Sequence, residues 1–402
     1  MAPSPHEASL FDRVKQNALT PKNIFQGLVL GLLAFILTPR SEDIVEFKPF
    51  QRELGDTKNT INLHTDAYSR TNVLIPSAST TENTTVNLAA WLYEPSIPPD
   101  AAAKPPIVVM AHGLGGQRDF GLHKYADAYA RNGFAALVFD YRGFGGSDGE
   151  PRQLVSPQMQ LEDWEAAITY TQSTELAPKV DASRLLLWGT SYSGGHVLVT
   201  ASKLGEKIKA VVAQVPFLGA RHTGIKSTKT RGLSASIRLL MAGIADKLAS
   251  MAGKSPMYVK LAGSPGEVAF MAMSPEELHA YKAKQPAHKQ GGWRNMVPAR
   301  FVFEAPRYNP LDYLGSIKSP VMLISAAQDA LCPHEVVAQA AAQLPGSELV
   351  TLDCDHFSLY LEKNWEYTIK KQLEFMRKHA SEEDALDLGS QKTEKKDIKS
   401  EL

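Results

Sequence analysis

The sequence has little cysteine, no net charge and few long apolar runs. Its 402 residues include only 2 Cys, so neither a disulfide scaffold nor a four-cysteine zinc site can form. The 43 Lys plus Arg balance 43 Asp plus Glu, which removes the long-range attraction that nucleic acid binding needs. We therefore expect a chain that folds by packing, with no nucleic acid partner, no metal and no cofactor.

One segment is apolar enough to suggest a membrane. Residues 24–37 contain a single polar side chain, Gln26. The run is shorter than the roughly 20 residues of a spanning helix, and Pro21 and Pro39 bracket it. Residues 1–45 are thus predicted to be a leader that spans a membrane, lies on one, or packs on the domain. The predicted location is membrane-associated, with a single pass in the endoplasmic reticulum as one option, or cytoplasmic.

The other end of the chain is polar. Residues 381–402 mix both charges without periodicity, which predicts a disordered tail. The tail ends in KSEL, one residue away from the retrieval signal KDEL, a weak match that chance explains better.

Between these ends, short apolar runs alternate with helical patterns, which predicts a mainly parallel sheet covered by helices on both faces. Expected strands are 86–93, 107–110, 134–140, 184–188, 208–215, 321–325 and 348–352. Helices are expected after Ser156-Pro157, an N-cap and first-turn pair, and around Trp365 to Met376. The domain is expected to cover residues 60–380.

The interval 216–320 is too long for a loop and is predicted to be a helical insertion. Seven apolar residues from Leu233 to Met251 form one face of a helix, and Ser274 to Glu277 form a capping box. Six of the 11 methionines lie here. They are expected either in a core or in an apolar wall that faces a substrate.

The segment 184–199 has the pattern of a nucleophile elbow. A buried strand runs into Gly189-Thr190-Ser191-Tyr192-Ser193 and then a helix. In such an elbow a strained turn presents a serine hydroxyl at the top of the sheet. Ser191 is the predicted nucleophile, and Ser193 is the alternative. The same residues could instead form an anion-binding turn at a helix N-terminus, without a catalytic role.

A serine nucleophile needs a base and a carboxylate that orients the base. Asp329 follows the expected strand 321–325, and His356 follows the expected strand 348–352. The order Ser191, Asp329, His356 places all three at the carboxyl ends of strands, where ligands of such sheets bind. Alternative acids are Asp355 and, more remotely, Asp312 and Glu304.

An oxyanion hole is also expected. The strand 107–110 leads into Ala111-His112-Gly113-Leu114-Gly115-Gly116. The predicted donors are the backbone amides of Leu114 and Tyr192, each worth about 3 kcal/mol in the transition state. His112 is interpreted as structural.

With HGLGG, DYRGFGGSDG, GTSYSGG, Asp329 and DHF in this order, the chain resembles the α/β-hydrolase family, and within it the branch of dienelactone hydrolases and Xaa-Pro dipeptidyl peptidases. The resemblance implies an eight-stranded sheet, a catalytic triad of Ser191, Asp329 and His356, and a cap after the sixth strand. Ser193 departs from the usual glycine at the elbow.

The predicted function is therefore a serine hydrolase that cleaves a small, apolar carboxylic ester or thioester through an acyl-enzyme. Alternatives are an Xaa-Pro type peptidase, an acyltransferase that uses the same triad, and a non-catalytic binding protein. Cys332 and Cys354 lie beside the proposed acid and base. Two thiols are expected, with a disulfide as the alternative. The sequence does not indicate an oligomeric state.

Overall fold

The computed structural model describes residues 26–27, 38–46, 63–80, 84–96, 104–283 and 293–381. The predicted apolar run and polar tail fall outside these residues, apart from Gln26, Gly27 and Ser381. Within the described ranges, no helix combines the length and the apolar character that crossing a bilayer requires.

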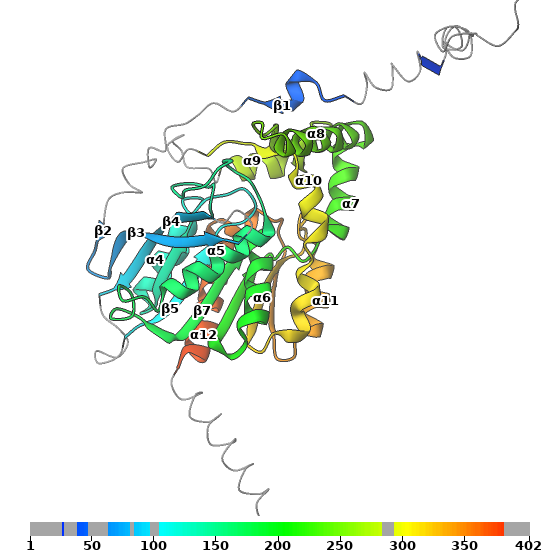
Figure 1. The fold of residues 1–402 in the computed structure, drawn as a ribbon. Helices are drawn as coiled ribbons and strands as arrows, with labels where there is room; N and C mark the ends of the chain where they lie inside the picture. The colour runs from blue at the N-terminus through cyan, green and yellow to red at the C-terminus, as the bar shows by residue number, and fades with distance from the viewer. Residues whose placement is uncertain are drawn as a thin grey trace, which may run out of the picture.

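A central sheet organises the body of the molecule (Figure 1). It has nine strands among the described residues, in the order β13-β12-β8-β7-β5-β6-β4-β3-β2. The strands from β13 to β6 are parallel, and β4, β3 and β2 are antiparallel. Their bounds are β2 Leu63–His64, β3 Tyr68–Ser79, β4 Thr84–Pro95, β5 Pro106–Ala111, β6 Ala135–Phe139, β7 Asp181–Thr190, β8 Ile208–Gln214, β12 Val321–Ala326 and β13 Glu348–Leu352. Eight long strands match the expected sheet, and the two-residue β2 is additional.

Helices cover both faces of this sheet, which explains the continuous apolar runs of its strands. In β5, Ile107 and Val109 contribute to one core, and Val108 and Met110 contribute to the other. The first core includes side chains of α5, α6 and α11, and the second includes side chains of α4 and α12. These helices are α4 Leu122–Arg131, α5 Pro157–Tyr170, α6 Tyr192–Leu204, α11 His334–Gln343 and α12 Glu362–Ala380.

The local helix signals in the body are confirmed. Ser156 is the N-cap of α5, and its side chain accepts a hydrogen bond from the amide of Met159. In α12, Ile369 and Met376 are buried against the sheet, as their spacing predicts.

The insertion between β8 and β12 is only partly helical. It contains α7 Ala220–Arg231, α8 Leu233–Met251, β9 Tyr258–Gly263, β10 Ala269–Ala272, α9 Pro275–Ala283, β11 Val297–Pro298, α10 Phe301–Glu304, η4 Ala305–Arg307 and η5 Pro310–Ser316. The strands β9, β10 and β11 form a small sheet with β1 Ile44–Val45. The predicted helical insertion thus also contains strands. Two of them, β10 and β11, pair with β9 within the insertion, and β1 pairs with β9 from about 200 residues upstream, a contact that local periodicity does not reveal. The boundaries 216–320 stay a prediction.

The last residues of the predicted leader, 1–45, contact the cap. Val45 pairs with Tyr258 of β9, and Asp43 is buried. The end of the segment 1–45 is therefore part of the cap.

The helix α8 begins and ends where the apolar pattern predicts, but it packs through another face. Its buried residues are Ala235, Arg238, Leu239, Ala242, Gly243 and Asp246. A Cβ atom at Gly243 would lie 2.4 Å from a side-chain carbon of Val302, so the small residues allow close approach. Most of the large apolar side chains on α8 are exposed. The capping box at α9 is confirmed by reciprocal hydrogen bonds of Ser274 and Glu277.

Candidate active site

The turn between β7 and α6 holds Ser191 in a strained conformation. Ser191 has φ 56° and ψ −120°, a positive φ that a residue with a side chain rarely adopts. Its amide donates a hydrogen bond to the carbonyl of Gln214 at 2.8 Å. A Cβ atom at Gly189 would lie 2.3 Å from the carbonyl oxygen of Ser193, so glycine is required there. The local sequence thus folds as the predicted elbow.

The alternative nucleophile Ser193 lies elsewhere. It is fully buried, and its hydroxyl makes a 2.9 Å hydrogen bond with the hydroxyl of Tyr141. Trp164 donates to the same tyrosine oxygen. Ser193 therefore belongs to the core beneath the elbow.

Asp329 and His356 come together as the order of strands suggests. The Nδ1 atom of His356 lies 2.6 Å from Oδ2 of Asp329, and both side chains are almost completely buried. The other carboxylate oxygen accepts hydrogen bonds from the amides of Leu331 and Cys332, each at 2.7 Å. These bonds fix the carboxylate, so it can hold the imidazole in one orientation.

The rival acid Asp355 has a different role. Its carboxylate accepts hydrogen bonds from the amides of Phe357 and Ser358 at 2.8 and 3.0 Å. It thereby holds the turn that leads into the short helix η6 Ser358–Tyr360. The remoter Asp312 accepts a hydrogen bond from Asn309 in the exposed start of η5.

Two hollows meet at Ser191. A small cleft of about 70 Å³ is lined by Ser191, His356, Leu114 and their neighbours. A larger cavity of about 740 Å³ also includes Ser191 and Leu114 in its wall. The serine therefore lies between the imidazole side of the site and a space that a substrate can fill.

The backbone around Leu114 and Tyr192 suits an oxyanion hole. Tyr192 is the first residue of α6, so its amide is one of the four that the helix leaves without an internal acceptor. A Cβ atom at Gly113 would lie 2.9 Å from the Cβ atom of Ser191. The loop can therefore approach the serine this closely only with glycine. His112 is buried beside Asp140, and burial lowers the pKa of its imidazole, which agrees with a structural role.

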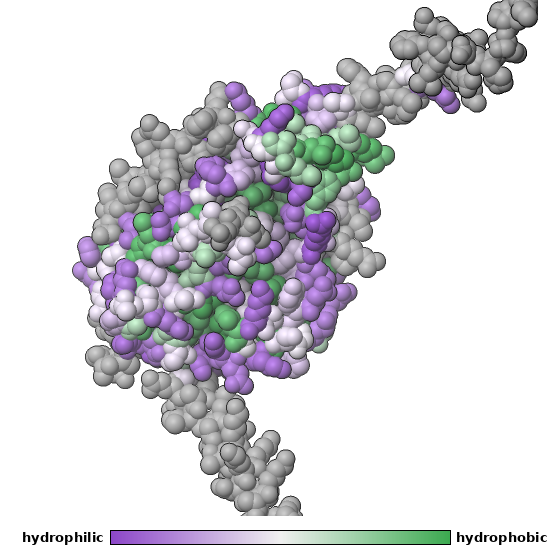
Figure 2. Space-filling model, viewed as in Figure 1, coloured by the Kyte–Doolittle hydropathy of each residue, from purple (hydrophilic) through white to green (hydrophobic). Residues whose placement is uncertain are grey.

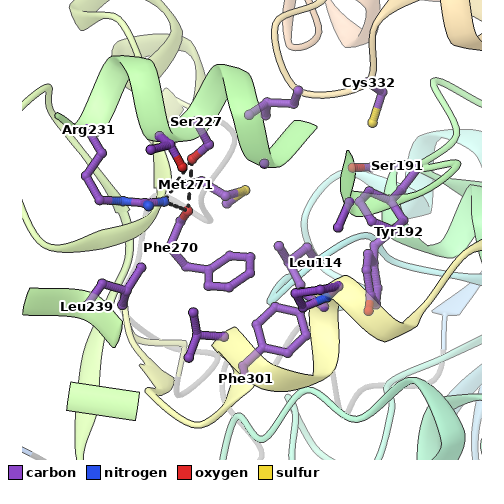
Figure 3. A pocket seen from close by; sticks show the side chains of 18 of the residues that line it. Leu114, Ser191, Tyr192, Ser227, Arg231, Leu239, Phe270, Met271, Phe301 and Cys332 are labelled. Carbon is purple, nitrogen blue, oxygen red and sulfur yellow. Dashed lines mark hydrogen bonds between the residues drawn. The ribbon is translucent and has the colours of Figure 1, made fainter. Parts of the chain in front are cut away.

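The large cavity is mainly apolar and is built largely by the cap (Figure 3). Its described lining residues include no Asp or Glu. Ser191 and Arg231 lie at opposite ends of it in Figure 3. The apolar side chains labelled there are Leu114, Leu239, Phe270, Met271 and Phe301.

Arg231 is a cation in this wall. Its guanidinium donates hydrogen bonds to the carbonyls of Ala269 and Phe270 and to the hydroxyl of Ser227. Burial lowers the pKa of Arg231 to about 10, so the group stays charged at neutral pH. Arg231, the last residue of α7, is therefore hydrogen-bonded to the backbone of β10.

Both cysteines are buried thiols, and no disulfide joins them. Cys332 lines the large cavity near Ser191 (Figure 3). Burial, together with the Asp329 carboxylate, raises the pKa of this thiol well above its ordinary value, although a hydrogen bond with Ser191 opposes the shift. A protonated thiol is a poor nucleophile. Sequence reasoning placed Cys332 on the acid loop but did not identify it as part of the cavity wall.

Asp329, Cys332 and His356 also offer atoms within 4.8 Å of one another. The Asp329 carboxylate already accepts three hydrogen bonds. The arrangement suits proton transfer better than metal binding.

The sheet, the strained serine turn and the cap identify a serine hydrolase of the α/β-hydrolase class. The family model described as "Serine aminopeptidase, S33" matches residues 103–356, and the chain belongs to this family of α/β-hydrolases.

Relatives of this chain include a quorum-quenching protein and a thiohydrolase. The chain is 35% identical over 293 residues to the quorum-quenching protein AidA of Acinetobacter baumannii, covering 73% of this chain and 91% of that one. It is 26% identical to the thiohydrolase aneE of Aspergillus aculeatus, covering 72% and 90%. The crystal structure of the α/β-hydrolase GrgF from Penicillium superposes with a TM-score of 0.60 at 22% identity, covering 77% and 99%, which supports the fold.

Proposed function

We propose that Ser191, Asp329 and His356 form the catalytic triad. The observation that carries this proposal is the buried 2.6 Å contact between His356 and Asp329 in a cleft whose wall also contains the strained Ser191. In the proposed first step, Ser191 Oγ forms a bond to the substrate carbonyl carbon while its proton passes to Nε2 of His356. Asp329 holds the imidazole through Nδ1.

The amides of Leu114 and Tyr192 are proposed to stabilise the oxygen that becomes negative in this step. Collapse of the tetrahedral intermediate breaks the bond to the leaving group, which takes the proton from His356. A water molecule then gives its proton to His356 and attacks the acyl-Ser191 ester. This second cycle releases the acid and restores the serine.

The substrate class we propose is an ester or thioester with an apolar part. The cavity beside Ser191 has room for such a group and presents phenylalanine, leucine and methionine side chains. An aminopeptidase or dipeptidyl peptidase must bind the ammonium group of its substrate, usually with a carboxylate. The described lining residues of the cavity contain Lys229 and Arg231 but no acid. We therefore rank the Xaa-Pro peptidase alternative, and membership of the dienelactone and Xaa-Pro branch, below an esterase or thioesterase.

Acyl transfer is the second candidate. One relative, 24% identical, is named polyketide transferase grgF, and another is named a thiohydrolase. Both transfer to an alcohol and transfer to water can proceed from the same acyl-serine. Adding an alcohol during turnover and measuring the ratio of ester to acid products separates the two activities.

The triad is tested by labelling the protein with a fluorophosphonate probe. We expect one adduct on Ser191 in the wild type and none in Ser191→Ala, with labelling retained in the matched variant Ser193→Ala. Labelling that persists in Ser191→Ala contradicts the assignment. Absence of both labelling and turnover with p-nitrophenyl esters of short and long chains would favour a non-catalytic binding protein.

A further inference from the structure

The outer face of α8 carries an unusual amount of exposed apolar surface. Twelve large apolar side chains are well exposed among the described residues, and half of them lie on this one helix. They are Leu233 at 73%, Leu240 at 42%, Met241 at 41%, Ile244 at 39%, Leu248 at 60% and Met251 at 76% exposure. We call these six side chains the α8 ridge. Figure 2 shows the corresponding hydrophobic patch over the helix.

The ridge follows from the way α8 packs. The inward face uses small residues and two ion pairs, Arg238 with Asp43 and Asp246 with Arg300. Large apolar residues at spacings of three and four therefore form a continuous stripe on the opposite side. A contiguous exposed patch of this kind marks a surface that binds something apolar.

The charged residues of α8 indicate what kind of surface could cover the ridge. Asp246 is the only carboxylate of the helix, and it is fully buried. Lys247 is the one exposed ionisable side chain between Leu233 and Met251. An apolar stripe with an exposed cation and no exposed acid suits a lipid surface, where helices lie with the apolar face in the acyl region.

The chain upstream supports the same partner. Asp43 accepts hydrogen bonds from Arg238 of α8, so the described segment that follows the apolar run in the sequence is attached to this helix. The sequence of residues 24–37 is apolar except for Gln26. A bilayer can accept both this run and the ridge.

We propose that the α8 ridge seats the enzyme on a lipid bilayer, as an interfacial contact rather than a span. Leu239, on the inner side of the same helix, lines the large cavity. In this arrangement the membrane lies on the outer side of α8, and the large cavity lies on its inner side. A consequence, which rests on the proposed function, is that substrates dissolved in the bilayer are hydrolysed preferentially.

Vesicle flotation tests the contact without relying on activity. The full chain is mixed with phosphatidylcholine vesicles, and the bound fraction is compared with that of the double variant Leu240→Glu/Leu248→Glu. Leu349, 39% exposed, and Leu74, 57% exposed, lie outside the ridge. Leu349→Glu/Leu74→Glu is therefore a control with matched side chains and matched exposure.

We expect the ridge variant to lose about tenfold in vesicle partitioning, since each leucine transferred to lipid contributes apolar area, and the control to bind like the wild type. Both variants should hydrolyse p-nitrophenyl butyrate in solution at the wild-type rate, which keeps this test independent of the proposed chemistry. Equal flotation of the ridge variant and the wild type overturns the proposal. So does an absence of wild-type flotation, and sedimentation as a dimer that the ridge variant abolishes would then assign the ridge to a second copy of the chain.

Discussion

The sheet body and the cap hold their functional residues in different ways. In the body, Ser191 and Asp329 lie at the ends of parallel strands, and backbone hydrogen bonds fix each of them. In the cap, α8 is held by ion pairs and small residues, and its large apolar side chains face outward. The body thus positions individual side chains, whereas the cap supplies the wall of the large cavity and an exposed apolar face.

This difference suggests that the body determines the reaction rate of the proposed enzyme and that the cap determines its preference among substrates. The proposed reacting groups all come from the body, and most of the wall of the large cavity comes from the cap. Substitutions in the body should lower the rate for every substrate, because they act on the transition state. Substitutions in the cap should change the preference among substrates.

The largest expected effect is at the triad acid. Asp329→Asn should lower kcat by about 10⁴-fold, because an amide does not hold the imidazole in the reactive tautomer. Asp355→Asn is the matched control and should keep activity within about tenfold, since the Asp355 carboxylate accepts hydrogen bonds from the amides of the turn before η6. Steady-state kinetics with p-nitrophenyl butyrate measure both. The reverse ranking would make Asp355 the acid.

The oxyanion loop should be the next most sensitive part of the body. Gly113→Ala places a methyl group 2.9 Å from the Cβ atom of Ser191, so the serine or the loop must shift. We expect about a 100-fold loss of kcat. At Gly116 the nearest atom to an added Cβ is 3.5 Å away, and Gly116→Ala should be close to neutral. Equal activity of the two variants would show that the loop tolerates displacement.

In the cap, Met271 offers a test of substrate selection. Met271→Trp fills part of the large cavity, which Met271 lines. We expect kcat/KM for a p-nitrophenyl ester of a long acid to fall about tenfold relative to the butyrate ester. Met251→Trp lies on the exposed outer face of α8 and should leave this ratio unchanged. A uniform loss for all chain lengths in Met271→Trp would contradict the separation of roles.

The smallest effect is expected at Cys332. Cys332→Ala should change kcat by less than about threefold, because the raised pKa of this thiol keeps it protonated at neutral pH. Native protein should react slowly with iodoacetamide at Cys332, as mass spectrometry of the modified peptide would show. Rapid alkylation accompanied by loss of activity would give the thiol a chemical role.

The sequence predicted the body well because its signals are local. Short apolar runs gave β5, β7, β8, β12 and β13 at nearly the observed bounds. Ser156 and Pro157 marked the start of α5. The elbow around Ser191 could be anticipated because a strand, a small-residue turn and a helix follow one another without interruption. The assignment of catalytic roles stays a prediction.

The cap could not be predicted to the same degree because its structure depends on distant contacts. The strand β9 pairs with β1, which lies about 200 residues earlier. The helical pattern from Leu233 to Met251 located α8, but periodicity does not say which face is buried. That choice depends on Asp43 and Arg300, the partners of two charged residues of the helix.

The central claim is that an ester acylates Ser191 of the body while its apolar part occupies the cavity of the cap. Rapid acid quenching during turnover of a p-nitrophenyl ester, followed by fragmentation of the modified peptide, tests this claim directly. We predict a mass increase equal to the acyl group, located on Ser191 and absent in Ser191→Ala. An acyl group on Ser193 or Cys332, or turnover that continues in Ser191→Ala, would contradict the account.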